Sequence, residues 1–138
     1  MRIAADLIAE IVEHAREEAP NECCGVVAVR PGSPAEAVGV HRAVNAAASP
    51  LRFEIEPRNV LDLINAIEEE GLELGAIYHS HTRTAPYPSQ TDLNFAASWP
   101  GVEWIIVGLA GEGVEPEVRS FLIEGGEITE VELSATVP

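Results

Sequence analysis

A short apolar run that leads into two histidines constrains the fold of this chain more than any other feature. Leu74 to Tyr78 is apolar and follows a break at Gly71, which predicts a buried strand. Side chains two positions apart on a strand project to the same face. His79 and His81, which continue this run, are therefore expected to point in the same direction.

The residues after the histidines predict a loop and then a helix. The segment Thr82 to Pro88 contains two prolines and is excluded from a helix interior, whereas Ser89 to Ala97 has apolar residues at helix-compatible positions. Ser89 is placed at or just before the N-terminus of this helix, and Asp92 in its first turn. A loop of this length allows Asp92 to turn back toward the two imidazoles.

The two histidines and the aspartate form a donor set typical of a catalytic metal site. Catalytic zinc usually has three nitrogen or oxygen ligands from the protein and leaves a fourth position to water, whose pKa it lowers to roughly 7. His79, His81 and Asp92 supply two imidazoles and one carboxylate, and Glu22 offers a further carboxylate far upstream. Composition favours a role for Asp92, because the chain has 20 Glu but 3 Asp. We therefore predict about one zinc ion per chain.

Each part of this pattern also has a structural interpretation. A Ser-x-x-acid spacing before an apolar helix is the capping-box pattern, so Ser89 and Asp92 are also explained as a helix cap. An isolated His-x-His on a strand is also explained as solvated or hydrogen-bonded. The remaining histidines, His14 and His41, have no partner at ligand spacing and are expected to be structural.

The adjacent cysteines Cys23 and Cys24 raise a rival chemistry. Their adjacency disfavours both a strain-free disulfide and joint ligation of a metal, and one of them is expected to pack inward as a small hydrophobe. A cysteine hydrolase would pair one of these thiols with His79 or His81 as the base. A cysteine hydrolase gives a role to only part of the set formed by His79, His81 and Asp92. The zinc interpretation gives a role to all three.

Five positions of the chain resemble the signature of a known family. Glu22 stands in an E-x-C-G context, His79-Ser80-His81 gives H-[ST]-H, and Ser89-x-x-Asp92 follows seven residues later. This pattern resembles the JAMM (MPN-plus) metalloproteases, and among them the small stand-alone prokaryotic Mec-like isopeptidases. Thr82 departs from many family members, including the eukaryotic deubiquitinases, which carry proline after the second histidine.

The resemblance implies a role for each of these residues. His79, His81 and Asp92 are expected to bind zinc. Glu22 is expected to be the general acid/base, which takes a proton from the zinc-bound water and passes it to the departing amine. Ser89 is expected to donate its hydroxyl to the tetrahedral oxyanion, a role that its capping of the helix accompanies or replaces.

The resemblance also implies a class of substrate. It predicts cleavage of an amide after the C-terminal Gly-Gly tail of a small ubiquitin-like sulfur-carrier protein, with release of cysteine or another adduct. Thr82 favours this activity over a ubiquitin-directed one. Two alternatives stay open: a deubiquitinase-like isopeptidase acting on lysine-linked conjugates, and a non-catalytic MPN-type scaffold. The scaffold is disfavoured because such members lose ligands that this chain retains.

Composition limits the expected partners and location. A net charge of -15 argues against nucleic acid and anionic membranes, because phosphate binding is driven by Lys and Arg. The chain shows no apolar run near 18 residues and no basic, hydrophobic leader, so neither a membrane span nor a signal peptide is expected. Since the cysteines give no disulfide framework, we expect a cytoplasmic protein.

The remaining elements complete a single α/β domain over residues 1–138. Its layers are expected to be a mixed, largely antiparallel sheet flanked by helices, which matches the JAMM/MPN, cytidine-deaminase-like fold implied by the resemblance. Two hairpins are expected: one joins the strands Gly25–Arg30 and Ala37–Val44, and the other joins Glu117–Glu124 and Glu127–Leu133. Predicted helices are Ile3–Ala19 and Pro57–Glu70, and predicted strands are Gly25–Arg30, Ala37–Val44, Val102–Leu109, Glu117–Glu124 and Glu127–Leu133.

Overall fold

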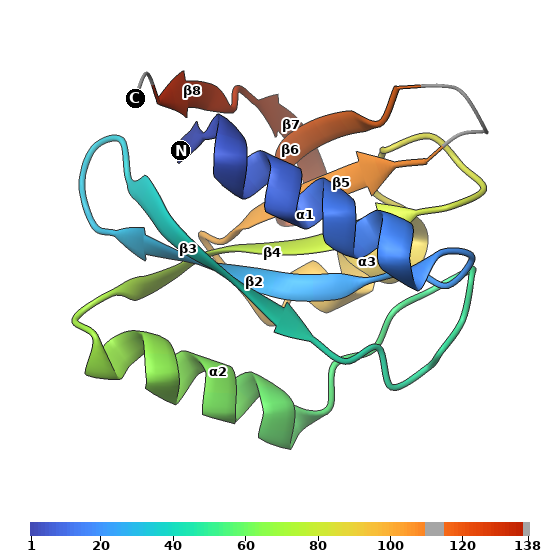
Figure 1. Ribbon diagram of the computed structural model, residues 1–138, viewed down its shortest axis with the longest axis horizontal. Helices are drawn as coiled ribbons and strands as arrows, with labels where there is room; N and C mark the ends of the chain where they lie inside the picture. Colours follow the sequence, from blue (N-terminus) through green and yellow to red (C-terminus); the bar gives the residue numbers. More distant parts are fainter. Residues whose placement is uncertain (110–114, 137–138) are drawn as a thin grey trace.

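The strands of the chain form a mixed sheet in this computed structural model, which describes residues 1–109 and 115–136 (Figure 1). Within the described residues the strand order is β7-β6-β5-β4-β2-β3-β1-β8. The strands are β1 (Arg2–Ala4), β2 (Cys24–Arg30), β3 (Glu36–Ala43), β4 (Glu73–His81), β5 (Glu103–Gly108), β6 (Glu117–Glu124), β7 (Glu127–Val131) and β8 (Ser134–Thr136). The helices are α1 (Ala5–Glu18), α2 (Pro57–Glu69) and α3 (Gln90–Ala96).

The sheet combines antiparallel and parallel pairs of strands. β2 pairs antiparallel with both β3 and β4, and β6 pairs antiparallel with both β5 and β7. β4 and β5 are parallel, as are the pairs of β1 with β3 and β8. The predicted fold class, a mixed and largely antiparallel sheet flanked by helices, is therefore confirmed together with both predicted hairpins.

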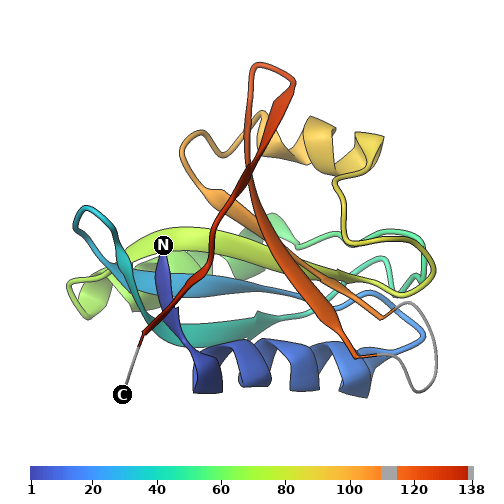
Figure 2. The same cartoon turned by 90° about the horizontal axis from the view of Figure 1, so that it is seen from above.

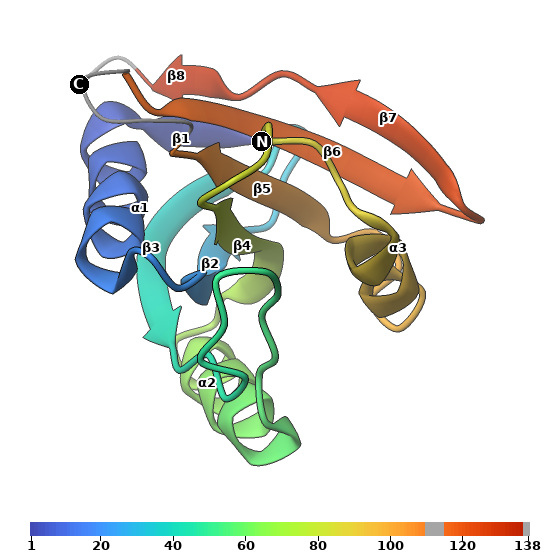
Figure 3. The ribbon, with the colours of Figure 1, turned by 90° about the vertical axis from the view of Figure 1, so that its right-hand side faces the viewer.

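Helices cover both faces of the sheet. α1 packs on one face, and α2 and α3 lie on the other (Figures 2 and 3). Alternation along the strands divides the apolar side chains between the faces: Val27 and Ile105 pack on the α1 side, whereas Val26 and Ile106 pack on the side of α2 and α3. Burial of each such side chain contributes about 1.5–3 kcal/mol. These two cores fix the central strands and, with them, the end of β4.

A glycine at the end of β5 allows a loop to lie close to the strand ends. Gly108 is the partner of His81 in the β4–β5 ladder. A Cβ atom at Gly108 would lie 2.7 Å from Cδ of Pro86, which is buried. Glycine therefore permits the loop of residues 82–88 to pass over this edge on its way from β4 to α3.

Two short strands, β1 and the edge strand β8, are absent from the sequence prediction. Ile3, expected in the first helix, lies in β1, so that α1 begins at Ala5. The strand predicted over Glu127–Leu133 ends at Val131, and β8 follows it as a separate element. Both β1 and β8 have three residues, too few for alternation to mark them, and they form by pairing with each other.

The other predicted boundaries agree closely with the structure. The strand predicted over Leu74–Tyr78 extends to His81, so both histidines lie within β4. The predicted domain of residues 1–138 includes residues 110–114 and 137–138, which lie outside the described residues. No helix in the described residues has the length and apolar character needed to cross a membrane.

Candidate metal centre

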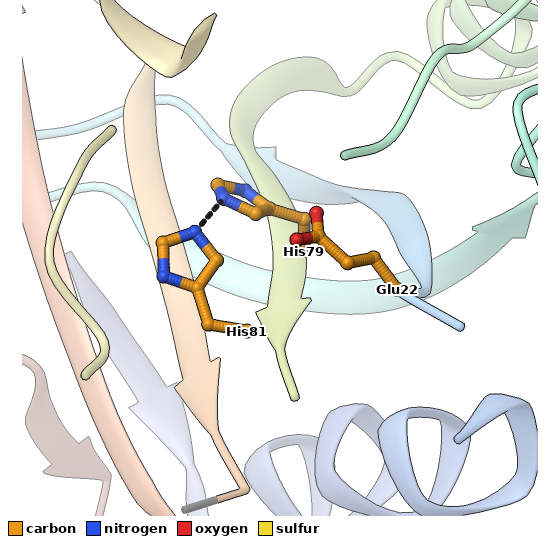
Figure 4. A group of neighbouring side chains, drawn as sticks. All are labelled: Glu22, His79 and His81. Carbon is orange, nitrogen blue, oxygen red and sulfur yellow. Dashed lines mark hydrogen bonds between the residues drawn. The ribbon is translucent and has the colours of Figure 1, made fainter. Parts of the chain in front are cut away.

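The end of β4 presents two imidazoles to one side of the sheet. β4 lies between β2 and β5, and the alternation of a strand places His79 and His81 on the same face. Their Nε2 atoms are 3.1 Å apart, and both side chains are buried. Figure 4 shows the two rings turned toward each other, with the carboxylate of Glu22 beside them.

The N-terminus of α3 brings a carboxylate to the two imidazoles. Ser89 is the N-cap: its Oγ accepts from the Asp92 N–H at 3.2 Å, and its own N–H donates to Oδ2 of Asp92 at 2.8 Å. The same carboxylate lies 3.2 Å (Oδ1) from Nε2 of His79 and 3.3 Å (Oδ2) from Nε2 of His81. The capping box and the approach to the histidines, two alternative explanations of one pattern, therefore occur together. The cap itself holds Asp92 in the orientation that reaches the imidazoles.

Glu22 reaches the histidines from the segment that precedes β2. Cys24 pairs with His79 in the β2–β4 ladder, which brings Glu22 alongside the end of β4. Glu22, His79 and His81 each offer one ligand atom, and these atoms lie within 4.8 Å of one another. Glu22 is only 5% exposed. Burial raises the pKa of its carboxyl to about 7, while His81 opposes this shift and the negative charge of Asp92 adds to it.

Burial and hydrogen bonds act in opposite directions on the other titratable groups. Burial disfavours the charged form of Asp92, but hydrogen bonds with His79 and His81 outweigh it and hold the pKa of Asp92 far below its usual range. Burial lowers the pKa of His79. Burial also acts to lower the pKa of His81, but hydrogen bonds with Asp92 and the Ala85 carbonyl raise it overall.

The spacing of these groups is that of a tetrahedral metal site. Ligand atoms around zinc, with bonds of about 2.0–2.1 Å, lie about 3.3 Å from one another. The two Nε2 atoms are 3.1 Å apart, and the Asp92 carboxylate lies 3.2 Å from that of His79 through Oδ1 and 3.3 Å from that of His81 through Oδ2. The carbonyl of Ala85 accepts from Nδ1 of His81 at 2.9 Å, and in the neutral ring this places the proton on Nδ1 and leaves the lone pair of Nε2 for a metal. The ring of His79 stacks on Phe53 at 4.5 Å, which fixes its orientation. The donor set therefore fits a zinc ion.

The remaining histidines, His14 and His41, lie outside this cluster. Nδ1 of buried His14 is 2.7 Å from the hydroxyl oxygen of Tyr78, and burial lowers the pKa of His14. His41 lies on β3. Among the described residues, neither belongs to a group of three or more side chains that could hold a metal ion.

Both cysteines are buried, where the sequence predicts burial of one. Cys23 packs in the core on the α1 side, and Cys24 packs in the core on the opposite side. Burial raises the pKa of Cys23 to about 11 and that of Cys24 to about 12. Because the thiolate is the nucleophilic form, these thiols are poorly suited to catalysis at neutral pH. The structure thus argues against a cysteine hydrolase.

Three side chains to which the sequence analysis assigns no part in holding Glu22 fasten the segment that carries it. Ser80 Oγ accepts from the N–H of the residue after Glu22 at 2.8 Å. Thr82 Oγ1 donates to the carbonyl of Pro20 at 3.0 Å, and Asn45 Nδ2 donates to the carbonyl of Glu22 at 2.9 Å. These contacts join segments far apart in the chain, so no spacing motif marks them. The tendency of asparagine to form local turns is the one signal at Asn45.

The family described as prokaryotic homologs of the JAB domain matches residues 4–124 of the chain. The chain belongs to this family. The matched residues include the whole cluster formed by β4, the N-terminus of α3 and the segment before β2. The predicted membership of the JAMM/MPN group is therefore confirmed.

Curated relatives of this JAB domain are similar along most of its length. The CysO-cysteine peptidase of Mycobacterium tuberculosis (strain ATCC 25618 / H37Rv) is 35% identical over 128 residues, covering 93% of this chain and 86% of the relative. The desampylase of Haloferax volcanii is 39% identical over 112 residues, with coverage of 77% and 78%. A probable TtuB-protein conjugate cleaving protease of Thermus thermophilus is 37% identical over 129 residues, with coverage of 92% and 79%.

A solved structure supports the same relationship. The solution structure of protein DSY2949 from Desulfitobacterium hafniense matches this JAB domain with a TM-score of 0.87 and 28% identity, covering 98% of this chain and 92% of that one. The family and the peptidases related to it make the chain an enzyme of the JAB isopeptidase class, as predicted.

Proposed function

We propose that this JAB domain is a zinc peptidase that hydrolyses the amide after the C-terminal Gly-Gly tail of a small ubiquitin-like sulfur carrier and releases cysteine. The observation that carries the proposal is the buried cluster in which Glu22 and the Asp92 carboxylate converge on His79 and His81. Similarity to a CysO-cysteine peptidase over most of both chains supports the substrate class. Thr82, in place of the proline found in many ubiquitin-directed relatives, favours the same branch of the family.

His79, His81 and Asp92 would hold the zinc ion. Zinc bound in such a site polarises a carbonyl and lowers the pKa of a water molecule to roughly 7. The Ala85 carbonyl sets the tautomer of His81, and the helix cap sets the rotamer of Asp92. Both groups are thus oriented in advance, as outer hydrogen bonds orient metal ligands in general.

Glu22 would take up and release the proton. Burial raises the pKa of this carboxyl to about 7 in the metal-free protein, and a carboxyl that can take up a proton can also pass it on. Amide hydrolysis requires both steps, because an amine leaves poorly when it is not protonated. The same carboxylate, placed beside the histidine nitrogens, would serve the attacking water first and the departing amine afterwards.

Ser89 would donate a hydrogen bond from its hydroxyl to the tetrahedral oxyanion. In the helix cap the hydroxyl oxygen accepts a hydrogen bond from the Asp92 N–H, so the cap uses a lone pair. The hydroxyl proton stays free for a second partner, and Ser89 is exposed. Capping and oxyanion stabilisation are therefore compatible in one side chain.

Ser89→Ala tests the oxyanion role. We expect kcat to fall roughly 10²- to 10³-fold, as for removal of one oxyanion donor, and the folded state to lose about 1 kcal/mol with the cap. Ser89→Thr keeps both the hydroxyl and the cap and is the matched control. Steady-state kinetics and thermal melts separate the two effects. If Ser89→Ala lowers Tm and leaves kcat unchanged, Ser89 is a helix cap alone.

The substrate is tested with a sulfur carrier that bears cysteine on its C-terminal glycine. We expect mass spectrometry to show loss of the cysteine residue after incubation, and a carrier whose last two glycines are alanines to react slowly, because glycine lets the backbone pass close to the metal. Lysine-linked ubiquitin chains should be cleaved weakly or not at all. Rapid cleavage of ubiquitin chains beside an untouched carrier adduct would overturn the substrate assignment.

Cleavage of carrier–protein conjugates is the second candidate function. It is favoured by similarity to a probable TtuB-protein conjugate cleaving protease. A carrier joined through its terminal glycine to a lysine side chain tests it in the same assay. The non-catalytic scaffold is disfavoured, because the cluster retains the full donor set and the buried Glu22.

A further inference from the structure

Glu22 lies in a stretch of chain without regular secondary structure. Residues 21–23 precede β2, so no helix or strand ladder fixes the backbone at Glu22. Both of its main-chain groups are nevertheless hydrogen-bonded to the loop of residues 44–56, between β3 and α2. The N–H of Glu22 donates to the carbonyl of Ser49 at 2.9 Å, and the carbonyl of Glu22 accepts from Nδ2 of Asn45 at 2.9 Å. The position of this carboxylate therefore depends on the loop.

Asn45 uses its whole hydrogen-bonding capacity in these contacts. Nδ2 donates to the carbonyls of Glu22 and Arg52, at 2.9 and 3.1 Å. Oδ1 accepts from the N–H groups of Ala47 and Glu54, each at 3.0 Å. An amide side chain has two donor hydrogens and two acceptor lone pairs, so none is left unused. Asn45 thus joins the Glu22 segment to the beginning of the loop, at Ala47, and to its end, at Arg52 and Glu54.

The turn that follows Asn45 contains a strained residue. Ala48 has a φ of 44°, in the left-handed region that favours glycine. Its N–H donates to the main-chain carbonyl of Asn45 at 3.0 Å. Such a conformation persists where the surroundings hold it, and it is found often at functional sites. The turn positions Ser49, whose carbonyl accepts from Glu22.

We propose that Asn45 is a positioning residue for the reaction and holds the Glu22 carboxylate against His79 and His81. This inference rests on the function proposed above, because it assigns Asn45 to the same reaction. Asn45 acts through the main chain of Glu22. A general base must lie within about 2.6–3.2 Å of the proton it takes, and a misplacement of about 1 Å costs roughly 10²-fold in rate.

Asn45→Asp is the sharpest variant, because it removes the Nδ2 contacts to the carbonyls of Glu22 and Arg52 and keeps the Oδ1 contacts within the turn. Aspartate retains an acceptor for the N–H groups of Ala47 and Glu54, but it replaces the Nδ2 donor with an oxygen that repels the carbonyl of Glu22. We expect kcat on the carrier–cysteine adduct to fall about 10- to 100-fold. KM should stay within about twofold and zinc content should stay the same, because neither substrate contacts nor ligands change.

Hydrogen exchange of the metal-free protein gives a readout that does not depend on turnover. The amide of Glu22 donates to the Ser49 carbonyl, so its exchange should be faster in Asn45→Asp than in the wild type. Asn59→Asp is the matched control: Asn59 is also half-buried, and its Oδ1 accepts from the main-chain N–H of Val44 at 3.3 Å. This control should leave both kcat and the exchange of Glu22 unchanged.

The outcomes separate this inference from the proposed function. If the wild type cleaves the adduct and Asn45→Asp loses thermal stability but keeps its kcat, Asn45 is merely structural and the inference is overturned. If the wild type cleaves no carrier adduct, the proposed function fails, and the exchange measurement decides whether Asn45 holds Glu22. Unaltered exchange of Glu22 in Asn45→Asp then overturns the inference, and faster exchange supports it.

Discussion

Replacement of His81 by alanine will abolish both zinc binding and hydrolysis. Nε2 of His81 lies 3.1 Å from Nε2 of His79 and 3.3 Å from the Asp92 carboxylate, so its loss opens one side of the donor set. We expect turnover to fall by more than about 10³-fold, beyond the loss of a single oxyanion donor, because zinc would supply both the nucleophile and the polarisation of the carbonyl. Metal analysis of the purified proteins should find about one zinc per chain in the wild type and none in the variant.

His41→Ala is the matched control for this experiment. His41 lies on β3 and outside the cluster, so its removal should change neither zinc content nor turnover. A strong chelator should reproduce the His81→Ala result in the wild type, and added zinc should restore activity. Full activity in strong chelator, or in His81→Ala, would contradict the assignment of the metal centre.

The parts of the site carried by β4 and α3 are predictable from sequence because their signals are local. The alternation of a strand places His79 and His81 on one face whatever the strand packs against. The Ser89–Asp92 spacing forms a capping box within one turn of helix. Local rules thus fix the direction in which three of these side chains point. The structure adds that the cap and the histidines share one carboxylate.

The position of Glu22 is not readable from local sequence. It depends on the register of β2 against β4, in which Cys24 pairs with His79. That ladder shifts register between Val27 and Ala28, and a slip of one residue turns every side chain to the opposite face. The pairing of distant strands therefore brings the segment of Glu22 to the end of β4, and hydrogen bonds to the loop of residues 44–56 hold it there.

Thr82, which departs from the family pattern, makes contacts in the structure that a proline could not make. The sequence shows a threonine where many relatives have proline. In the structure its hydroxyl donates to the carbonyl of Pro20 at 3.0 Å, and the Pro50 carbonyl lies 3.3 Å away. Proline has no hydroxyl and cannot make these contacts. Thr82 thus links the end of β4 to the segment that carries Glu22.

Replacement of Glu22 by glutamine will lower turnover sharply and leave the zinc in place. Glutamine keeps the shape of the side chain but cannot take a proton, so we expect kcat to fall by roughly 10²- to 10⁴-fold. Glu18→Gln, which removes one carboxylate from an exposed position on α1, should leave kcat unchanged. Steady-state kinetics and metal analysis of the three proteins check this expectation.

Stability provides an independent check on the burial of Glu22. Burial raises the pKa of the Glu22 carboxyl to about 7 in the folded protein. The carboxyl therefore favours folding at pH values below the pKa that it has in the unfolded chain, and this contribution is lost as the pH rises toward 7. Glutamine does not titrate, so metal-free Glu22→Gln should gain stability relative to the wild type above pH 7, by up to about 3 kcal/mol. Denaturant melts at pH 5 and pH 8 measure this difference. A variant that loses stability at pH 8 contradicts the unfavourable burial of the charge.

The same variant decides between two roles that the geometry permits for Glu22. Its carboxylate offers a ligand atom within 4.8 Å of the imidazole nitrogens, so proximity alone does not distinguish a metal ligand from a proton carrier. A ligand would make Glu22→Gln lose zinc, as His81→Ala does. A general base leaves zinc bound and removes the rise in kcat/KM that the wild type should show with increasing pH as Glu22 loses its proton. Near-normal turnover with an unchanged pH profile would contradict both roles.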